Sequence, residues 1–408
     1  MAATSISRSN GTTRKYTRTD WTDFVHTGPD TLCGRYLRTF WQPVSRSEDL
    51  AAGEAKPVRI MSEDFTLYRG GAGDVHLLDF RCAHKGTQLS VGWVEGDNIR
   101  CYYHGWVYTS SGQCIEQPAE TKPFCEKIRI RSYPVEEYLG LVFAYLGEGS
   151  PPPMPRYPDH EEEGVHEAGV YIRACNWFQD FEPEPAHAPF VHRKGRPRPV
   201  PRVEAEQTEW GLVTRGIYAD GNQQVVQLGM PNIHHVMSPP RDQETGWRDN
   251  LLWKLPVDDD SHYTFQSNLF RITGDAAERY RERRAKWLEQ GGRAFAPELT
   301  SDALAGRVKV WNLWQEYPDV DITRVEDDVA YIGQGVIADP SQHHLGPSDV
   351  GTLLLRKMYS GELRALAQGK PLTQWRRTEA TRPIEARLPT ERPAYGVAAD
   401  LTYGVARE

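Results

Sequence analysis

The stretch that decides the fold runs from Arg81 to Trp106 and reads RCAHKGTQLSVGWVEGDNIRCYYHGW. It carries two pairs of soft metal ligands, each with one cysteine and one histidine: Cys82-x-His84 and Cys101-x-x-His104. A glycine follows each pair, Gly86 and Gly105, so the backbone can fold closely around the sulfurs. The segment between the pairs reads as a turn, a short strand and a second turn. The stretch therefore predicts a metal centre held on two hairpin tips.

The donor set suits an iron–sulfur cluster. In a Rieske [2Fe–2S] centre two cysteines hold one iron and two histidines replace cysteines on the other, which raises the reduction potential. Zinc is the alternative, because tetrahedral Zn²⁺ accepts two cysteines and two histidines as well. Zinc fingers usually pair Cys with Cys and His with His, whereas each loop here carries one of each. The sequence therefore favours the cluster over zinc.

The residues around the motif predict a small all-β domain. From Lys56 to about Leu146, short alternating runs are bounded by Gly, Pro, Asp and Asn, which is typical of antiparallel strands and turns. We expect strands at 57–61, 65–68, 76–80 and 139–146. A polar arm and lead-in segment (1–34) come first, and the cluster domain (35–150) begins with a short aromatic helix or turn and a strand. The proline run at 149–155 indicates a domain boundary.

The second half of the chain predicts a larger α+β domain over 156–368. Part of 175–192 is expected to be helical. Strands are expected at 203–218, 223–229, 251–255 and 263–272. Helices are expected at 275–290, from about 322, and at 348–368, where Ser348 and Asp349 can act as the N-cap. Strands followed by helices in this order favour an antiparallel sheet covered by helices. We expect residues 369–408 to form an extended tail.

Composition excludes several classes of partner. The 408 residues have a net charge of -8, which gives no electrostatic reason to bind nucleic acid or an anionic membrane. No apolar run approaches the length of a membrane span, and the N-terminus lacks the apolar core of a secretory signal, so we expect a cytoplasmic protein. Four cysteines remain outside the cluster motif, and their irregular spacing favours free thiols over disulfides or further ligands: Cys33, Cys114, Cys125 and Cys175.

A second candidate metal site lies in NWFQDFEPEPAHAPFVH, residues 176–192. His187 and His192 are five residues apart, and Glu184 precedes the first by three. On a helix that opens slightly these side chains share a face, so two imidazoles could meet one metal. Two histidines and a carboxylate from elsewhere form the facial triad of non-haem Fe(II) oxygenases, with positions left open. Taken alone, the pair favours two surface histidines over a metal site; the upstream cluster changes this and favours the metal.

From about Gly34 to Gln368 the chain resembles the catalytic α subunit of a Rieske non-haem iron oxygenase, a ring-hydroxylating and O-demethylating family whose catalytic domain is a helix-grip, START-like fold. The cluster motif matches that of the family. Later segments resemble the phthalate-dioxygenase-like branch, which works without a β subunit. These segments are Asn176-Trp177-Phe178-Gln179 with His187 and His192, Glu326-Asp327-Asp328, Gln334-Gly335 and His344–Asp349. The resemblance implies His187, His192 and Asp327 as ligands of a mononuclear Fe(II). The fallback carboxylates are the neighbouring acids Asp328, Glu326 and Asp321.

Glu184 departs from the family, which usually has Asp at this position. The resemblance implies that this carboxylate hydrogen-bonds His187 and, across a subunit interface, His104 of the partner subunit. A carboxylate in this role fixes the tautomer and orientation of a ligating imidazole, and Glu does so with one extra methylene. Glu also occurs in the branch that demethylates or cleaves quaternary amines, which keeps a non-aromatic or amine substrate open as an alternative. A local ion pair is the non-functional interpretation of Glu184.

The resemblance implies a terminal oxygenase that uses O₂ and works as a head-to-tail homotrimer or a dimer of trimers. Electrons would come from NAD(P)H through a separate reductase or ferredoxin, in agreement with the lack of a Gly-rich dinucleotide fingerprint. The substrate would be a small aromatic, carboxylated compound that is hydroxylated, dihydroxylated or O-demethylated. A basic run after His192 could hold the carboxylate or could be a solvated face: Arg193, Lys194, Arg196 and Arg198. A pure electron carrier and a zinc protein are the rival classes.

Overall fold

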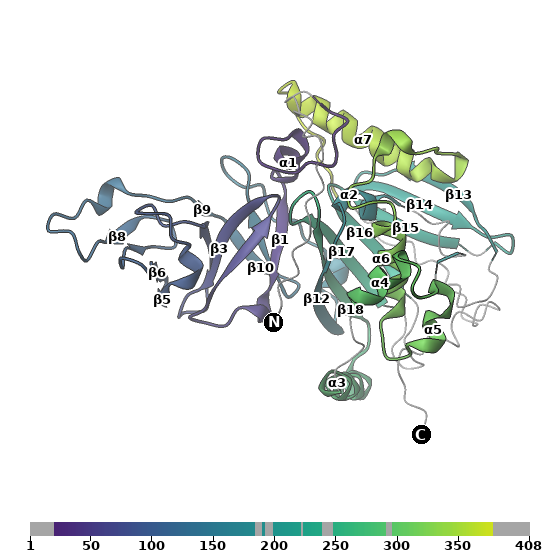
Figure 1. Cartoon of the computed structure of the whole chain (residues 1–408), viewed down its shortest axis with the longest axis horizontal. Coiled ribbons are helices and arrows are strands. Elements are labelled where there is room, and N and C mark those ends of the chain that lie inside the picture. The colour runs from purple at the N-terminus through teal and green to yellow at the C-terminus, as the bar shows by residue number, and fades with distance from the viewer. Residues whose placement is uncertain are drawn as a thin grey trace.

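The computed structural model describes residues 20–183, 190–191, 199–221, 223–238, 248–290 and 296–377. Figure 1 shows the strand-rich N-terminal part, in purple and blue, beside a large twisted sheet with helices, in teal to yellow. The predicted α+β class, a small all-β domain next to a larger antiparallel sheet with helices, is confirmed.

The N-terminal part begins with α1 (Leu32–Leu37), whose N-cap Thr31 accepts a hydrogen bond from the backbone of Gly34. Three small sheets follow, with strand orders β1-β11-β10, β2-β3-β4-β9 and β5-β6-β7-β8. Their strands are β1 (Trp41–Arg46), β2 (Ala55–Ile60), β3 (Glu63–Arg69), β4 (Val75–Asp79), β5 (Trp93–Glu95), β6 (Asn98–Arg100), β7 (Val107–Tyr108), β8 (Cys114–Glu116), β9 (Ser132–Tyr133), β10 (Val135–Tyr138) and β11 (Leu141–Tyr145). The strands predicted at 57–61, 65–68, 76–80 and 139–146 correspond to β2, β3, β4 and β11.

The second part is organised on one seven-stranded antiparallel sheet with the order β12-β18-β17-β16-β15-β14-β13. Its strands are β12 (Val165–Arg173), β13 (Arg202–Gln207), β14 (Gly211–Ile217), β15 (Gln223–Gly229), β16 (Ile233–Ser238), β17 (Arg248–Pro256) and β18 (His262–Phe270). The run at 203–218, predicted as one strand, is the hairpin of β13 and β14. We did not predict β12 and β16.

Helices pack against this sheet and around its edges (Figure 1). They are α2 (Trp177–Phe181), α3 (Gly274–Glu289), α4 (Pro297–Leu304), α5 (Leu313–Glu316), α6 (Ile322–Ile332) and α7 (Val350–Ala367). Helices α3, α6 and α7 were predicted. Asp349 is the N-cap of α7 by position, but its side chain accepts instead from the backbone of Gly346. None of the described helices is both long and apolar enough to cross a bilayer.

Apolar side chains of both parts form one continuous core. Phe143 of β11 meets Trp253 of β17 edge to face, with ring centroids 5.4 Å apart. The last described segment of the chain packs against this core as well, because the indole of Trp375 donates to the hydroxyl of Tyr36 on α1. Residues 370–377 therefore lie against the body of the protein, although they form no helix or strand.

Candidate metal centres

The two ligand loops have the same backbone construction. In the first, the N–H of Cys82 donates to Thr87 and that of Gly86 donates back to Cys82, both at 2.9 Å. In the second, the N–H of Cys101 donates to Trp106 at 2.8 Å and that of Gly105 donates back to Cys101 at 3.0 Å. Each loop closes through a glycine with positive φ, +79° and +73°, a conformation that side chains with a Cβ rarely adopt. The glycines therefore have the predicted role.

All four predicted cluster ligands come together at these tips. The thiols of Cys82 and Cys101 are buried, 3% and 1% exposed, and interact with each other. The rings of His84 and His104 lie 4.4 Å apart between centroids, and His84 stacks on Trp106 at 4.6 Å. The structure thus brings two sulfurs and two imidazoles together at one end of the small domain.

The donor set fits a [2Fe–2S] cluster. The Nδ1 atom of His84 is buried and has no hydrogen-bond partner within the described chain, and a buried polar atom without a partner is costly unless something binds it. Burial raises the pKa of the Cys82 thiol, and the Cys101 thiol beside it adds to this effect. Because binding to iron converts both thiols to thiolates, a cluster would resolve both features.

Sequence reasoning missed Tyr108, which is fully buried beside the cluster ligands. Its hydroxyl lies 3.2 Å from the sulfur of Cys82 and accepts a hydrogen bond from the backbone N–H of Ala83 at 3.1 Å. Ala83 occupies one of the two lone pairs of this hydroxyl, whose proton can be donated to the sulfur. The signal was local, since Tyr108 follows His104 by four residues on the strand that leaves the second loop.

Exposed aromatic side chains surround the open edge of the ligand loops. Tyr102 and Tyr103 are 62% and 60% exposed, Trp93 is 52% exposed, and the ring of Tyr103 lies 3.7 Å from that of His104. Large apolar groups gathered on a surface mark a contact site for another protein. His104 therefore lies beside a surface suited to a partner chain.

The predicted ligands of the mononuclear iron are only partly within the described residues. Glu184, His187 and His192 lie outside them, as do Arg193, Lys194, Arg196 and Arg198. The helix that leads into this segment is α2, shorter than the predicted stretch; its N-cap is Asn176, whose side chain accepts from the backbone of Phe178. The structure therefore defines how the segment begins.

The four candidate carboxylates of the third ligand lie on α6 or at its start and have different surroundings. Asp321 caps the helix by accepting from the backbone of Arg324. Glu326 is buried and accepts from the indole of Trp314 at 3.0 Å. Asp328 is buried and accepts from Arg173 Nε at 2.6 Å. The side chain of Asp327 is 28% exposed, and its carboxylate lies 3.9 Å from Arg173 Nη2.

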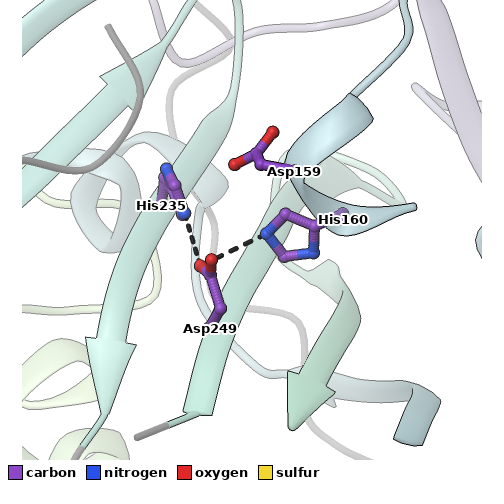
Figure 2. Close-up of side chains that lie close together, drawn as sticks. All are labelled: Asp159, His160, His235 and Asp249. Atoms are coloured by element: carbon purple, nitrogen blue, oxygen red, sulfur yellow. Dashed lines mark hydrogen bonds and ion pairs between the residues drawn. The ribbon is translucent and has the colours of Figure 1, made fainter. Parts of the chain in front are cut away.

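A different group of buried side chains also resembles a metal site. Asp159 and His160 precede the large sheet, and His235 (β16) and Asp249 (β17) lie on it; their ligand atoms are within 4.8 Å of one another. Figure 2 shows both imidazoles directed at the carboxylate of Asp249. The Nε2 atoms of His235 and His160 lie 2.5 and 3.2 Å from its Oδ1 atom.

Arginines already neutralise this group. Arg377 Nη2 lies 2.6 Å from Asp159 Oδ2 and 3.1 Å from His235 Nδ1, and Arg271 donates to Asp249 Oδ2 at 3.0 Å. Because a guanidinium only donates, His235 Nδ1 must accept, and its proton is on Nε2. A metal at Nε2 would need the lone pair that this tautomer lacks. The group is therefore a charge-balanced hydrogen-bond network.

The remaining cysteines match the prediction. All six cysteines are free thiols. Cys114 and Cys125 lie beside each other in the core of the cluster domain, and burial raises the pKa of Cys114 to about 12. The two are therefore neighbouring free thiols.

Comparison with known proteins adds a family match and similar chains. The model of the Rieske [2Fe-2S] domain matches residues 40–134. The chain is 31% identical over 370 residues to the phenoxybenzoate dioxygenase subunit alpha of Ectopseudomonas oleovorans, with 83% of each chain covered. It is 28% identical over 364 residues to the 5,5'-dehydrodivanillate O-demethylase oxygenase subunit of Sphingobium sp. (strain NBRC 103272 / SYK-6), covering 84% of this chain and 79% of the relative.

A solved structure supports the fold. The oxygenase in the reduced oxygenase–ferredoxin complex of carbazole 1,9a-dioxygenase superimposes with a TM-score of 0.57 at 18% identity, covering 83% of this chain and 93% of that chain. At this identity the similarity concerns the fold alone, and it extends through both parts of the molecule.

Proposed function

Because the chain belongs to the Rieske non-haem iron oxygenases, we propose that it is a terminal oxygenase component that hydroxylates or O-demethylates a small aromatic acid. Membership is shown by the 31% identity to a dioxygenase subunit over 83% of both chains. A chain of this family uses one [2Fe–2S] cluster and one mononuclear iron, and it receives electrons from a separate reductase or ferredoxin. When bound, the two metal groups supply electron transfer and O₂ activation.

The observation that carries the proposal is the convergence of the cluster ligands at the protein surface. Cys82 and Cys101 are buried, whereas His104 lies among exposed aromatic side chains. This arrangement excludes water from the sulfurs and leaves one histidine ligand accessible to an electron donor or a second subunit. A partner surface next to His104 is what a head-to-tail homotrimer requires, and we propose that assembly here.

For the mononuclear iron we propose His187, His192 and Asp327 as ligands. The family resemblance supports Asp327 as the carboxylate ligand, and its side chain is 28% exposed whereas Glu326 and Asp328 are buried. Two imidazoles and one carboxylate suit Fe(II) and leave coordination positions for oxygen and substrate.

We further propose that Glu184 connects the two metal groups across the subunit interface by hydrogen bonds to His187 and to His104 of the partner subunit. Changing Glu184 to Gln keeps the size of the side chain and removes its charge. We expect both metal groups to stay bound while oxidation of the reduced cluster slows in a single-turnover experiment. Wild-type electron-transfer rates in this variant would exclude the bridging role.

The substrate class is proposed from the relatives. The two relatives described above are named for an aromatic O-demethylase and an aromatic dioxygenase that act on acids, dehydrodivanillate and phenoxybenzoate. A panel of benzoates with methoxy, phenoxy and second carboxyl substituents, supplied with a surrogate reductase and NADH, would identify the substrate. Turnover of amines or aliphatic alcohols in place of the acids would overturn the substrate class and keep the family.

Metal analysis with a visible spectrum tests the proposal at the level of cofactors. A red-brown protein with about three irons per chain is expected for an oxygenase. About two irons per chain would indicate a pure electron carrier, and a colourless zinc protein would contradict the proposal altogether. A cytoplasmic location remains a prediction. It is supported by the need for electrons derived from NAD(P)H, which would be supplied there.

A further inference from the structure

The arginine that precedes each ligand cysteine makes the same contact with its loop. Arg81 Nη1 donates to the carbonyl oxygen of Gly86 at 2.9 Å. Arg100 Nη1 donates to the carbonyl oxygen of Gly105, also at 2.9 Å. In both loops the acceptor is the glycine with positive φ. The pattern Arg-Cys-x-x-x-Gly therefore occurs twice in the sequence, and both copies fold in the same way.

The side-chain bond completes the closure of each loop. Arg81 pairs antiparallel with Gln88 across the first loop. Arg100 pairs in the same way with Val107 across the second loop. Inside each loop, the backbone bonds use the N–H groups of the cysteine and of the glycine. The guanidinium adds a donor for the glycine carbonyl, so it ties the start of the loop to its end.

Arg100 is also held by two carboxylates on the neighbouring strands. Its Nε and Nη2 donate to Glu95, the last residue of β5, at 2.7 and 2.8 Å. Its Nη2 also donates to Glu116, the last residue of β8, at 2.8 Å. Because a guanidinium is a planar fork, it can make these bonds and the bond to Gly105 at once, whereas lysine donates from a single point. Arg100 thus connects both edge strands of this sheet to the second ligand loop.

The two arginines differ in their surroundings. Arg81 is exposed, and its guanidinium carbon lies 5.4 Å from the ring centroid of Phe80. The side chain of Arg100 is only 22% exposed. Because water competes for exposed charged groups, interactions of such groups contribute little. We therefore expect the bond from Arg100 to contribute more to loop closure than the bond from Arg81.

We propose that Arg100 is a positioning residue that keeps the second ligand loop closed around the metal centre, and that Arg81 does the same more weakly for the first loop. The inference rests on the iron–sulfur cluster of the proposed function. Gly105 directly follows His104, so the peptide that Arg100 holds helps to fix the backbone from which this imidazole extends. Release of a cluster requires the loop to open locally, and the bond from Arg100 to Gly105 must break when it does.

The test compares Arg100→Lys with the matched control Arg69→Lys in the full-length protein loaded with its cluster. Arg69 Nη1 donates to the carbonyl oxygen of Gly73 at 2.7 Å, and its guanidinium pairs with Glu137. Gly73 also has a positive φ, +102°, but the turn that it closes carries none of the proposed cluster ligands. Cluster release in excess iron chelator is followed by the loss of visible absorbance, and the reduced cluster is examined by EPR.

For Arg100→Lys we expect cluster release to be roughly 10- to 100-fold faster, the factor that corresponds to one hydrogen bond from a charged donor. The g values of the reduced cluster should change as well, because a ligand loop that is held less firmly orients its imidazole differently. Arg69→Lys should release the cluster at the wild-type rate with wild-type g values. Wild-type release and g values in Arg100→Lys would overturn the inference, and so would an equal acceleration in Arg69→Lys.

Two further results keep the outcome interpretable. If Arg100→Lys fails to fold, Arg81→Lys decides: we expect release to be about two- to fivefold faster, and the wild-type rate would overturn the inference. A colourless wild-type protein that binds zinc would contradict the cluster of the proposed function and the inference with it. A red-brown wild-type protein whose Arg100→Lys and Arg81→Lys variants both release the cluster at the wild-type rate would contradict the positioning role alone.

Discussion

Replacing Tyr108 by Phe should lower the reduction potential of the iron–sulfur cluster. The hydroxyl of Tyr108 lies 3.2 Å from the sulfur of Cys82 and accepts from the backbone N–H of Ala83. With a cluster bound, this sulfur would be a thiolate that can only accept, so the hydroxyl would donate its proton to it. Reduction adds negative charge to the cluster, so the hydrogen bond strengthens and favours the reduced state.

The size of the shift follows from the energy of the bond. A hydrogen bond to a charged group contributes about 1.5–3 kcal/mol, and we take about 1 kcal/mol as the part that differs between the two oxidation states. For one electron a tenfold change in equilibrium constant, about 1.4 kcal/mol, equals 59 mV, so the potential should fall by about 40 mV. The ring stays buried, and Phe preserves its packing.

The assay is a mediated reductive titration of the full-length protein, followed by circular dichroism in the visible range. Tyr68→Phe is the matched control: Tyr68 is equally buried in the same small core, but its hydroxyl donates to the carbonyl oxygen of Asp97 at 2.9 Å and contacts no ligand. A shift below about 10 mV in Tyr108→Phe, less than roughly 0.3 kcal/mol, would refute the reasoning. An equal shift in Tyr68→Phe would show that the effect does not act through the sulfur.

Three further outcomes are expected. Gly105→Ala forces a Cβ into a φ of +73°, which costs about 1–2 kcal/mol. This variant should therefore contain less cluster in an iron and sulfide assay. The control Gly53→Ala, at φ +82° and far from the ligand loops, should keep a full cluster. Arg377→Ala leaves the buried carboxylate of Asp159 and a ring nitrogen of His235 without their donor. The unfolding free energy in denaturant titrations should therefore fall by about 1–3 kcal/mol. The control Arg376→Ala, at an exposed position, should change it by less than about 0.5 kcal/mol. Burial alone would raise the pKa of Asp249, but the imidazoles of His160 and His235 next to its carboxylate hold that pKa well below its usual value of 3.8. The ionised carboxylate therefore stabilises the fold above that value, and this contribution is lost as pH falls further. Wild-type stability should accordingly drop more steeply than that of Asp249→Asn below about pH 4, and parallel curves would contradict this.

Features that depend on short spacings could be predicted from the sequence. The two ligand loops are closed by glycines four residues after each cysteine, so the proposed cluster ligands all lie within 26 residues. The strand expected at 223–229 and the helix expected at 275–290 agree with β15 and α3, since both have clear periodicity. Strand β16 was missed because its centre is a pair of histidines rather than an apolar alternation. Strand β12 was missed because it mixes polar and apolar residues on both faces.

Features that depend on contacts between distant segments were not predictable. Arg173 lies 155 residues before Asp328, and nothing in the local sequence of β12 distinguishes it from a surface arginine. The surroundings of the acids of α6 could not be predicted for the same reason. Asp321 caps the helix, Glu326 accepts from Trp314, and Asp328 accepts from Arg173.

The same accounting of donors and acceptors separates the two groups of histidines that resemble metal sites. Among the described residues His84 has a buried Nδ1 without a hydrogen-bond partner, and the thiols of Cys82 and Cys101 lie together beside it. His160 also has unpartnered ring nitrogens, but the groups with which it could share a metal are already bonded. Asp249 accepts from His235 and Arg271, and His235 is fixed by Arg377 with its proton on the nitrogen that a metal would need. Proximity of ligand-type atoms is therefore insufficient evidence for a metal, because the acids of the second group and its His235 ring are already bonded to two arginines.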